Sequence, residues 1–116
     1  MDLDTEVVLR RAVHEERRRT LAQIAGLQRT FTDIVEATEL TSTDDEHDPD
    51  GPTIAYERAQ VWSLLRQARE DLDSFDGALG RIDDGSIQVC GGCGGQIAVE
   101  RLFALPHTTR CIGCAR

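Results

Sequence analysis

The sequence is poor in the residues that build a thick globular core. Its 116 residues include three Phe, one Trp and one Tyr, so that aromatic residues make up only 4% of the chain. Hydrophobic residues still account for 40%, which is too high a share for a wholly disordered protein. The composition therefore favours one domain of elongated, helical build over a large globular fold.

The sequence contains no lysine. All 13 of its cations are arginine, and they face 21 carboxylates, which gives a formal net charge of −8 and a pI near 4.7. A protein that binds the phosphate backbone of nucleic acid needs clustered cations. The charge therefore argues against direct binding of DNA, sequence-specific binding included, and favours a basic partner.

The sequence also lacks the signals of export, membrane insertion and catalysis. No apolar run approaches the roughly 20 residues of a membrane span, and the first residues, MDLDTEVVLRR, are acidic where a signal peptide would be basic. No nucleophile elbow, P-loop, Rossmann fingerprint or metalloprotease His-Glu pair occurs. We therefore expect a cytoplasmic protein that has no membrane partner, no catalytic residues and no enzymatic activity.

The excess negative charge is concentrated in one segment. Residues 41–57, TSTDDEHDPDGPTIAYE, carry six acids and no base, a net charge of −6. The segments 1–40, 58–89 and 90–116 have net charges of −2, −2 and +2. Three quarters of the charge therefore lies in a Pro- and Gly-containing stretch between two segments of helical composition.

The segment after this acidic stretch has the clearest periodicity in the chain. Seam positions follow at alternating steps of four and three residues, and only Arg58 among them is not apolar: Ile54, Arg58, Val61, Leu65, Ala68, Leu72, Phe75, Leu79 and Ile82. A period of 3.5 residues is typical of a coiled-coil helix. Before the acidic stretch the pattern is looser: it includes Ile24, Leu27, Phe31 and Ile34, and Val7, Val8 and Val13 continue it weakly.

These patterns predict a mainly α fold, with a helix at about 4–39, an acidic tip at 41–53 and a second helix at about 53–84. Proline and glycine in the tip forbid one continuous helix, so the two helices should fold back as a long antiparallel coiled-coil hairpin over 1–85. A dimeric coiled coil is the alternative. Trp62 and Tyr56 are expected to pack beside the seam.

The C-terminal segment, 86–116, contains all four cysteines. Cys90 and Cys93 form one CxxC pair, and Cys111 and Cys114 form a second pair after 17 intervening residues. Two such pairs at this distance are typical of a tetrahedral Zn²⁺ site, although two disulfides or an iron site are alternatives. Because four thiolates close the coordination shell, we expect a small four-cysteine zinc finger with structural zinc, and His107 is expected to lie outside the ligand set.

The finger resembles a known family. The run from Cys90 to Cys114 reads C-x2-C-x3-I-x3-R-x4-P-x4-C-x2-C, with Ile97, Arg101 and Pro106 at its fixed places. This pattern is similar to the C4 zinc finger of the DksA/TraR family of bacterial transcription factors, in its shorter form. Gly91 departs from the acidic residue or Ser that usually follows the first Cys.

The resemblance implies a function. Proteins of this family bind RNA polymerase, insert the hairpin through its secondary channel and place acidic tip residues near the active site to modulate initiation. The best matches to the family's tip motif are Asp48 and Asp50, and Asp44 and Asp45 are further candidates. Two open alternatives are a transcript-cleavage factor whose tip carboxylates hold Mg²⁺, and an adaptor that binds protein or DNA through arginines of the finger.

The resemblance also bears on small effectors. Members of the family that respond to ppGpp use basic residues around the finger. Leu105 and Ala115 stand where those members carry Arg and Lys. This difference argues against dependence on ppGpp through that site.

Overall fold

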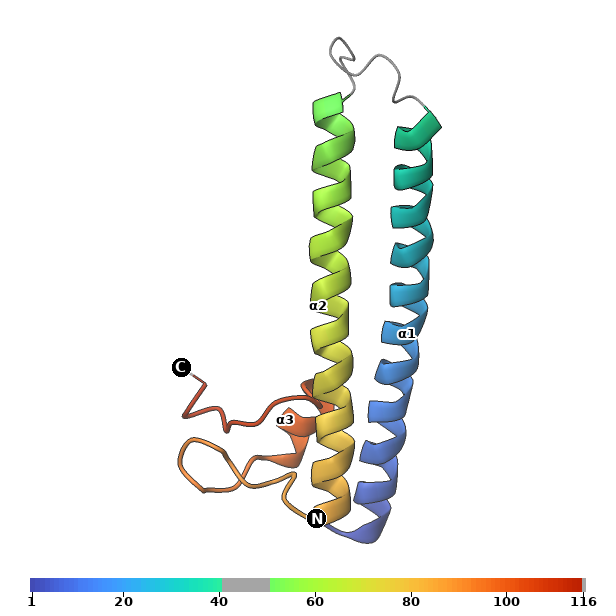
Figure 1. Cartoon of the computed structure of the whole chain (residues 1–116). Helices are drawn as coiled ribbons and strands as arrows, with labels where there is room; N and C mark the ends of the chain where they lie inside the picture. The colour runs from blue at the N-terminus through green and yellow to red at the C-terminus, as the bar shows by residue number, and fades with distance from the viewer. Residues whose placement is uncertain (41–50, 116) are drawn as a thin grey trace. The chain divides into compact units, whose positions relative to one another are not determined.

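The structure, a computed structural model, describes residues 1–40 and 51–115. They form three helices, α1 (Leu3–Leu40), α2 (Gly51–Asp84) and α3 (Val99–Ala104), and Figure 1 shows α1 and α2 running antiparallel, side by side. The described residues contain no strand, only an isolated bridge between Val89 and Gln96. The predicted fold class, a helical hairpin followed by a cysteine cluster, is confirmed. None of the described helices meets the length and hydropathy that a membrane span requires.

The ends of the long helices have clear local causes. Asp2 caps α1, because its Oδ1 accepts a hydrogen bond of 2.7 Å from the backbone N–H of Thr5. The helix α2 begins at Gly51, so that residues 51–53, assigned to the tip from the sequence, form its first turn. Pro52 fits there because a first-turn N–H has no partner within the helix.

The C-terminal end of α2 closes with a Schellman motif. Gly85 has a φ of 81°, and its N–H bonds the carbonyl of Ile82, while the N–H of Ser86 bonds the carbonyl of Arg81 at 2.9 Å. The left-handed φ is the reason that glycine occupies this position. The motif turns the chain out of the helix and into the cysteine-containing segment.

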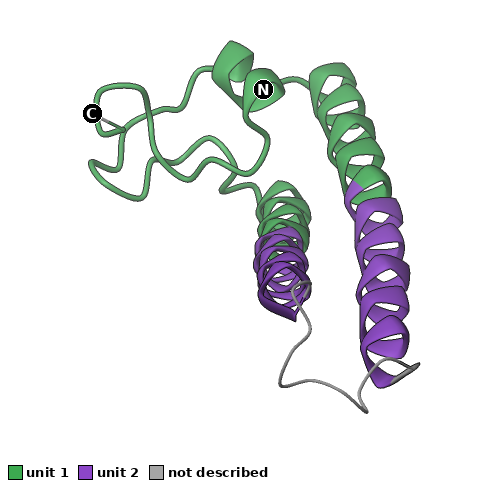
Figure 2. Ribbon diagram, turned by 90° about the horizontal axis from the view of Figure 1, so that it is seen from above, with its two compact units in different colours: residues 1–19, 71–116 green, residues 20–70 purple. Residues whose placement is uncertain are grey.

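The chain divides into two compact units (Figure 2). Unit 1 comprises Met1–Arg19 and Asp71–Arg116, and unit 2 comprises Thr20–Glu70. Unit 1 thus joins the first part of α1 and the last part of α2 to the whole cysteine-containing segment. The division into domains at 1–85 and 86–116 stays a prediction.

The core of unit 1 is shared by both long helices and the cysteine-containing segment. The buried residues in this cluster are Leu9, Val13, Phe75, Ala78, Ile82, Ile87, Cys90, Ile97 and Leu102. Ala78 lies off the predicted seam but is fully buried, because a third layer packs on α2 here. Val7 and Val8 are about half exposed, so their assignment to the seam was wrong, and Leu9 takes that role.

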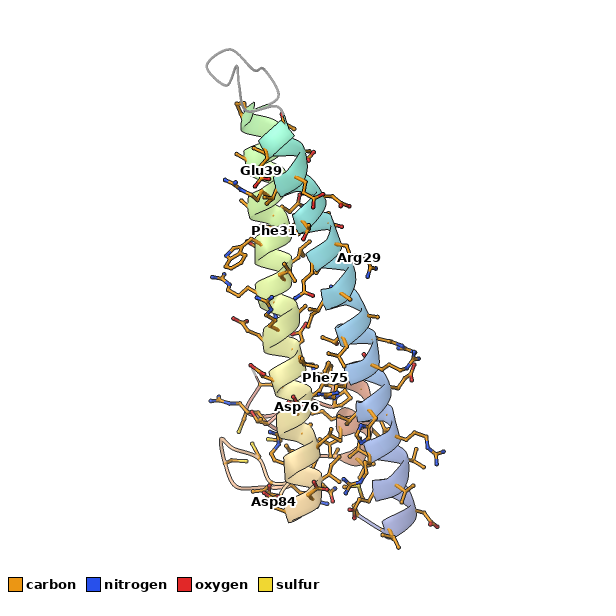
Figure 3. All side chains as sticks on the ribbon, turned by 45° about the vertical axis from the view of Figure 1, so that its right-hand side comes forward. Arg29, Phe31, Glu39, Phe75, Asp76 and Asp84 are labelled. Carbon is orange, nitrogen blue, oxygen red and sulfur yellow. The ribbon has the colours of Figure 1, made fainter. Side chains whose placement is uncertain are left out.

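Unit 2 is a two-helix coiled coil with a thinner core. Its buried residues are Thr20, Ile24, Leu65 and Ala68. Figure 3 labels Phe31, whose ring lies 6.2 Å from that of Trp62, so Trp62 packs beside the seam as predicted. Tyr56 is 70% exposed, and the prediction that it packs there was wrong.

Both units have the same antiparallel register. Ion pairs cross between the helices in unit 1, and one of them joins Arg17 Nε to Asp76 Oδ1 at 2.6 Å. In each of three cross-helix contacts the two residue numbers add to 93: Arg10–Asp83, Arg17–Asp76 and Phe31–Trp62. The heptad spacing is therefore kept in both units, as in a regular coiled coil.

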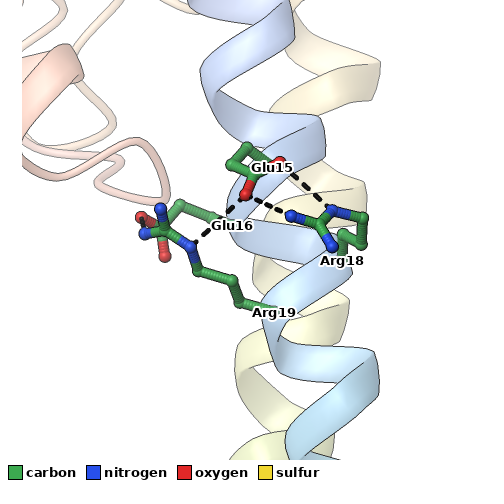
Figure 4. Close-up of polar contacts among 4 residues, drawn as sticks. All are labelled: Glu15, Glu16, Arg18 and Arg19. Carbon is green, nitrogen blue, oxygen red and sulfur yellow. Dashed lines mark hydrogen bonds and ion pairs between the residues drawn. The ribbon is translucent and has the colours of Figure 1, made fainter.

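Ion pairs also form along one face of α1. Figure 4 shows Glu15 accepting hydrogen bonds from Arg18 at 2.5 and 3.2 Å, while Arg19 lies 3.5 Å from Glu15 and 3.3 Å from Glu16. Pairs at these spacings on an exposed helix face stabilise the helix only weakly, because water screens the charges. Their larger effect is to neutralise charge locally.

Candidate metal centre

The first CxxC pair lies on a tight backbone turn. The N–H of Cys90 bonds the carbonyl of Gly95 at 2.8 Å, and the N–H of Gly94 bonds the carbonyl of Cys90 at 2.9 Å. Gly94 has a φ of 72°, which a residue with a side chain rarely adopts. This turn allows the sulfurs of Cys90 and Cys93 to lie within 4.8 Å of each other.

The second pair lies on a shorter turn and is tied to the first. The N–H groups of Cys114 and Ala115 both bond the carbonyl of Cys111 at 3.1 Å. The N–H of Gly91 bonds the carbonyl of Thr109 at 2.7 Å, and this bond links the two turns. Sequence reasoning missed Thr109, because a backbone carbonyl leaves no mark in a motif.

The two turns bring the four sulfur atoms together. The Sγ atoms of Cys90, Cys93, Cys111 and Cys114 all lie within 4.8 Å of one another, and the four thiols form no disulfide. The Sγ atoms of Cys93 and Cys111 are 3.8 Å apart. Four Zn–S bonds of about 2.3 Å in a tetrahedron would separate the sulfurs by about 3.8 Å. The donor set and its spacing therefore fit Zn²⁺.

Backbone N–H groups point at the sulfurs. Cys90 Sγ accepts from the N–H of Cys111 at 3.2 Å and from that of Gly92 at 3.3 Å, and Cys93 Sγ accepts from Gly95 at 3.4 Å. In the metal-free protein the N–H of Cys111, followed by those of Cys93 and Gly92, lowers the pKa of Cys90 to about 6. These donors stabilise thiolates, the form that binds zinc.

Cys114 differs from Cys90 in its surroundings. In the metal-free protein the neighbouring thiol of Cys111, then those of Cys93 and Cys90, raise the pKa of Cys114 to about 12. Sulfurs this close disfavour a second negative charge unless a cation lies between them. The metal therefore has to displace the proton of Cys114.

Glycine at position 92 is required by the packing of the site. A Cβ atom at Gly92 would lie 3.0 Å from Cys114 Sγ and 3.1 Å from its Cβ. Such an approach is tighter than most Cβ contacts, so a side chain at position 92 would push Cys114 away by a few tenths of an ångström.

The three motif residues between the cysteine pairs have structural roles. Ile97 is fully buried in the core of unit 1, and Pro106 is buried as well. Arg101 donates from Nε to the carbonyl of Arg110 at 2.9 Å and lies 3.4 Å from Thr108 Oγ1. Arg101 thereby fixes the segment that leads into the second cysteine pair.

Other predicted residues lie outside the centre. His107 is not part of the cysteine cluster, and its ring packs edge-on against Phe75 with 5.7 Å between centroids. The four candidate tip residues lie outside the described residues: Asp44, Asp45, Asp48 and Asp50.

A helical hairpin with a C-terminal centre of four cysteines defines a class of zinc-finger protein. Residues 85–116 match the sequence model of a family described as the prokaryotic dksA/traR C4-type zinc finger. The chain thus contains a DksA/TraR zinc finger, as the sequence resemblance led us to expect, and the expectation of structural zinc is confirmed.

The fold has a close counterpart among solved structures. The structure of transcription factor DksA2 from Pseudomonas aeruginosa superposes with a TM-score of 0.82 at 24% identity. The match covers 99% of this chain and 83% of the DksA2 chain. No match was found among curated proteins. The likeness to DksA2 shows that the two proteins share a fold.

Proposed function

We propose that this protein is a regulator of transcription initiation that binds RNA polymerase through the secondary channel. The observation that carries the proposal is the DksA/TraR zinc finger at residues 85–116. The shared fold with a protein described as a transcription factor supports it. The protein would act in the cytoplasm as a binding factor and would catalyse no reaction itself.

The distribution of charge fits this role. Residues 41–57 carry a net charge of −6, and five of their six acids lie in 41–50, between two helices of 38 and 34 residues. The shorter helix is about 50 Å long, which is enough to bring a charged segment deep into a channel. A channel that admits nucleoside triphosphates must have a basic lining, and a basic lining attracts an acidic segment.

Measurement of open-complex lifetime tests the proposal. The zinc-bound protein should shorten the lifetime of open complexes formed by purified bacterial RNA polymerase. The variant Asp48→Asn/Asp50→Asn should still bind the polymerase but lose this effect. Asp33→Asn/Glu36→Gln removes the same charge from α1, outside the acidic segment, and should behave as the wild type.

Two further measurements separate the alternatives. Cys111→Ser should reduce polymerase binding, because it removes one zinc ligand. Magnesium-dependent shortening of RNA in stalled complexes would favour the cleavage-factor alternative. No effect on open complexes, or equal effects of both acidic double variants, would contradict the proposal.

A further inference from the structure

A hollow separate from the metal centre opens between the start of α1 and α3, both within unit 1. Its volume is about 410 Å³, and it is lined by Asp4, Thr5, Val8, Val99, Glu100 and Phe103. None of these residues is a cysteine or a neighbour of one in the sequence. The lining thus includes no zinc ligand and no residue of the acidic segment 41–57.

The apolar floor of the hollow is exposed, but the residues next to it in the sequence are packed in the core. Val8 is 52% exposed and Phe103 is 38% exposed. Their sequence neighbours Leu9 and Leu102 are fully buried in the core of unit 1. The core therefore fixes the backbone on both sides of the hollow, while two apolar side chains remain free to contact a partner.

The walls of the hollow are acidic. Asp4 lies on the side of α1 and Glu100 lies on α3, and the lining contains no arginine. Among the described residues, neither carboxylate forms an ion pair, whereas Glu6, Glu15 and Glu16 on α1 each pair with an arginine. The hollow thus combines an apolar floor with two carboxylates that have no cation of their own.

We propose that this hollow docks a basic, amphipathic segment of a partner protein. An apolar side chain of that segment contacts Val8 and Phe103, and flanking Lys or Arg side chains lie against Asp4 and Glu100. The complementary charges orient the segment and speed its encounter, and burial of the apolar side chain supplies affinity. The hollow shares residues of α3 with the finger, but its lining includes no cysteine and no residue of 41–57, so peptide binding there is tested without RNA polymerase.

Short synthetic peptides serve as the probe. One peptide alternates Leu and Arg, a second has Glu in place of Arg, and a third has Ser in place of Leu. Each is titrated into the full zinc-bound chain, and backbone amide shifts are followed by NMR. The Leu-Arg peptide should shift amides around Val8, Val99 and Phe103, and the other two peptides should leave those amides unchanged.

Matched variants distinguish binding in the hollow from nonspecific attraction of a basic peptide to an acidic protein. Val8→Arg places a cation in the hollow and should weaken binding of the Leu-Arg peptide at least about tenfold. Val7→Arg adds the same charge at a neighbouring position of similar exposure outside the lining, and should have little effect. Likewise, Glu100→Gln should weaken binding more than Asp73→Asn, which changes an exposed carboxylate of α2.

Several outcomes would overturn the proposal. Shifts confined to residues 41–57 would mean that the peptide binds only the acidic segment. Equal effects of Val7→Arg and Val8→Arg, or equal binding of the Glu-containing peptide, would remove the hollow from the interaction. Sedimentation that shows a dimer which Val8→Arg dissociates would assign the hollow to a second copy of this chain instead.

Discussion

Replacement of Leu102 tests whether the finger and the ends of the long helices share one core. Leu102 lies on α3, is fully buried and belongs to the same cluster as Leu9 and Val13 of α1. Truncation of a fully buried Leu to Ala removes its transfer free energy and leaves a cavity, at a cost of about 2–5 kcal/mol. We therefore expect Leu102→Ala to lower the free energy of unfolding of the zinc-bound protein by about 3 kcal/mol.

Urea denaturation followed by circular dichroism measures this change. With a denaturant dependence of roughly 1.5 kcal/mol per molar urea, the midpoint should fall by about 2 M. Leu3→Ala is the matched control, because Leu3 is 74% exposed in the same unit, and it should change the free energy of unfolding by less than about 0.5 kcal/mol. Leu102→Ala should retain one zinc ion per chain, since Leu102 supplies no ligand.

Similar midpoints for the two variants would refute the reasoning. Leu102 would then contribute nothing that an exposed leucine does not, and the cluster in unit 1 would not act as a packed core. Loss of zinc from Leu102→Ala would show instead that the packed core is needed to hold the four sulfurs together.

The remaining predictions concern the metal centre and the coiled coil. Gly92→Ala should weaken zinc binding at least about tenfold, because its Cβ would lie 3.0 Å from Cys114 Sγ, and competition with a chromophoric chelator measures this. Zinc affinity should fall as pH falls, because protons compete with zinc for the thiolates. The number of protons released per zinc ion should rise by about one as pH decreases through about 6, because Cys90 becomes protonated there. Calorimetry in buffers of different ionisation enthalpy counts the released protons, and a number that does not change with pH would contradict the prediction. A double-mutant cycle on Arg17 and Asp76 should give a coupling of about 0.3–1 kcal/mol at low salt that disappears in about 1 M NaCl, because both side chains are partly exposed.

The hairpin and the cysteine cluster followed from local sequence patterns. The period of 3.5 residues from Ile54 to Ile82 marks the apolar face of a single helix. Leu65, Ala68 and Ile82 on this face are buried, as the period predicts. The cysteine spacing is also a local pattern, because each CxxC pair needs only its own turn to bring two sulfurs together.

The positions that the pattern assigned wrongly depend on a third layer. The sequence of α1 offers Val7, Val8 and Leu9 in a row, and periodicity alone does not choose among them. Packing of the cysteine-containing segment chooses Leu9, and it also buries Ala78 of α2. Contacts between segments far apart in the sequence decide these positions, so one helix period cannot reveal them.

Arginine placement concentrates the protein's effective charge. Arg10 and Arg17 neutralise carboxylates of α2, and Arg18 and Arg19 neutralise neighbours on α1. Residues 41–57 contain no base and carry a net charge of −6 out of a total of −8. Because charges are screened over about 8 Å at physiological salt, a partner responds to this local charge and not to the total. Association with a basic surface should therefore slow with added salt, and removal of carboxylates from 41–57 should slow it more than removal of equal charge elsewhere.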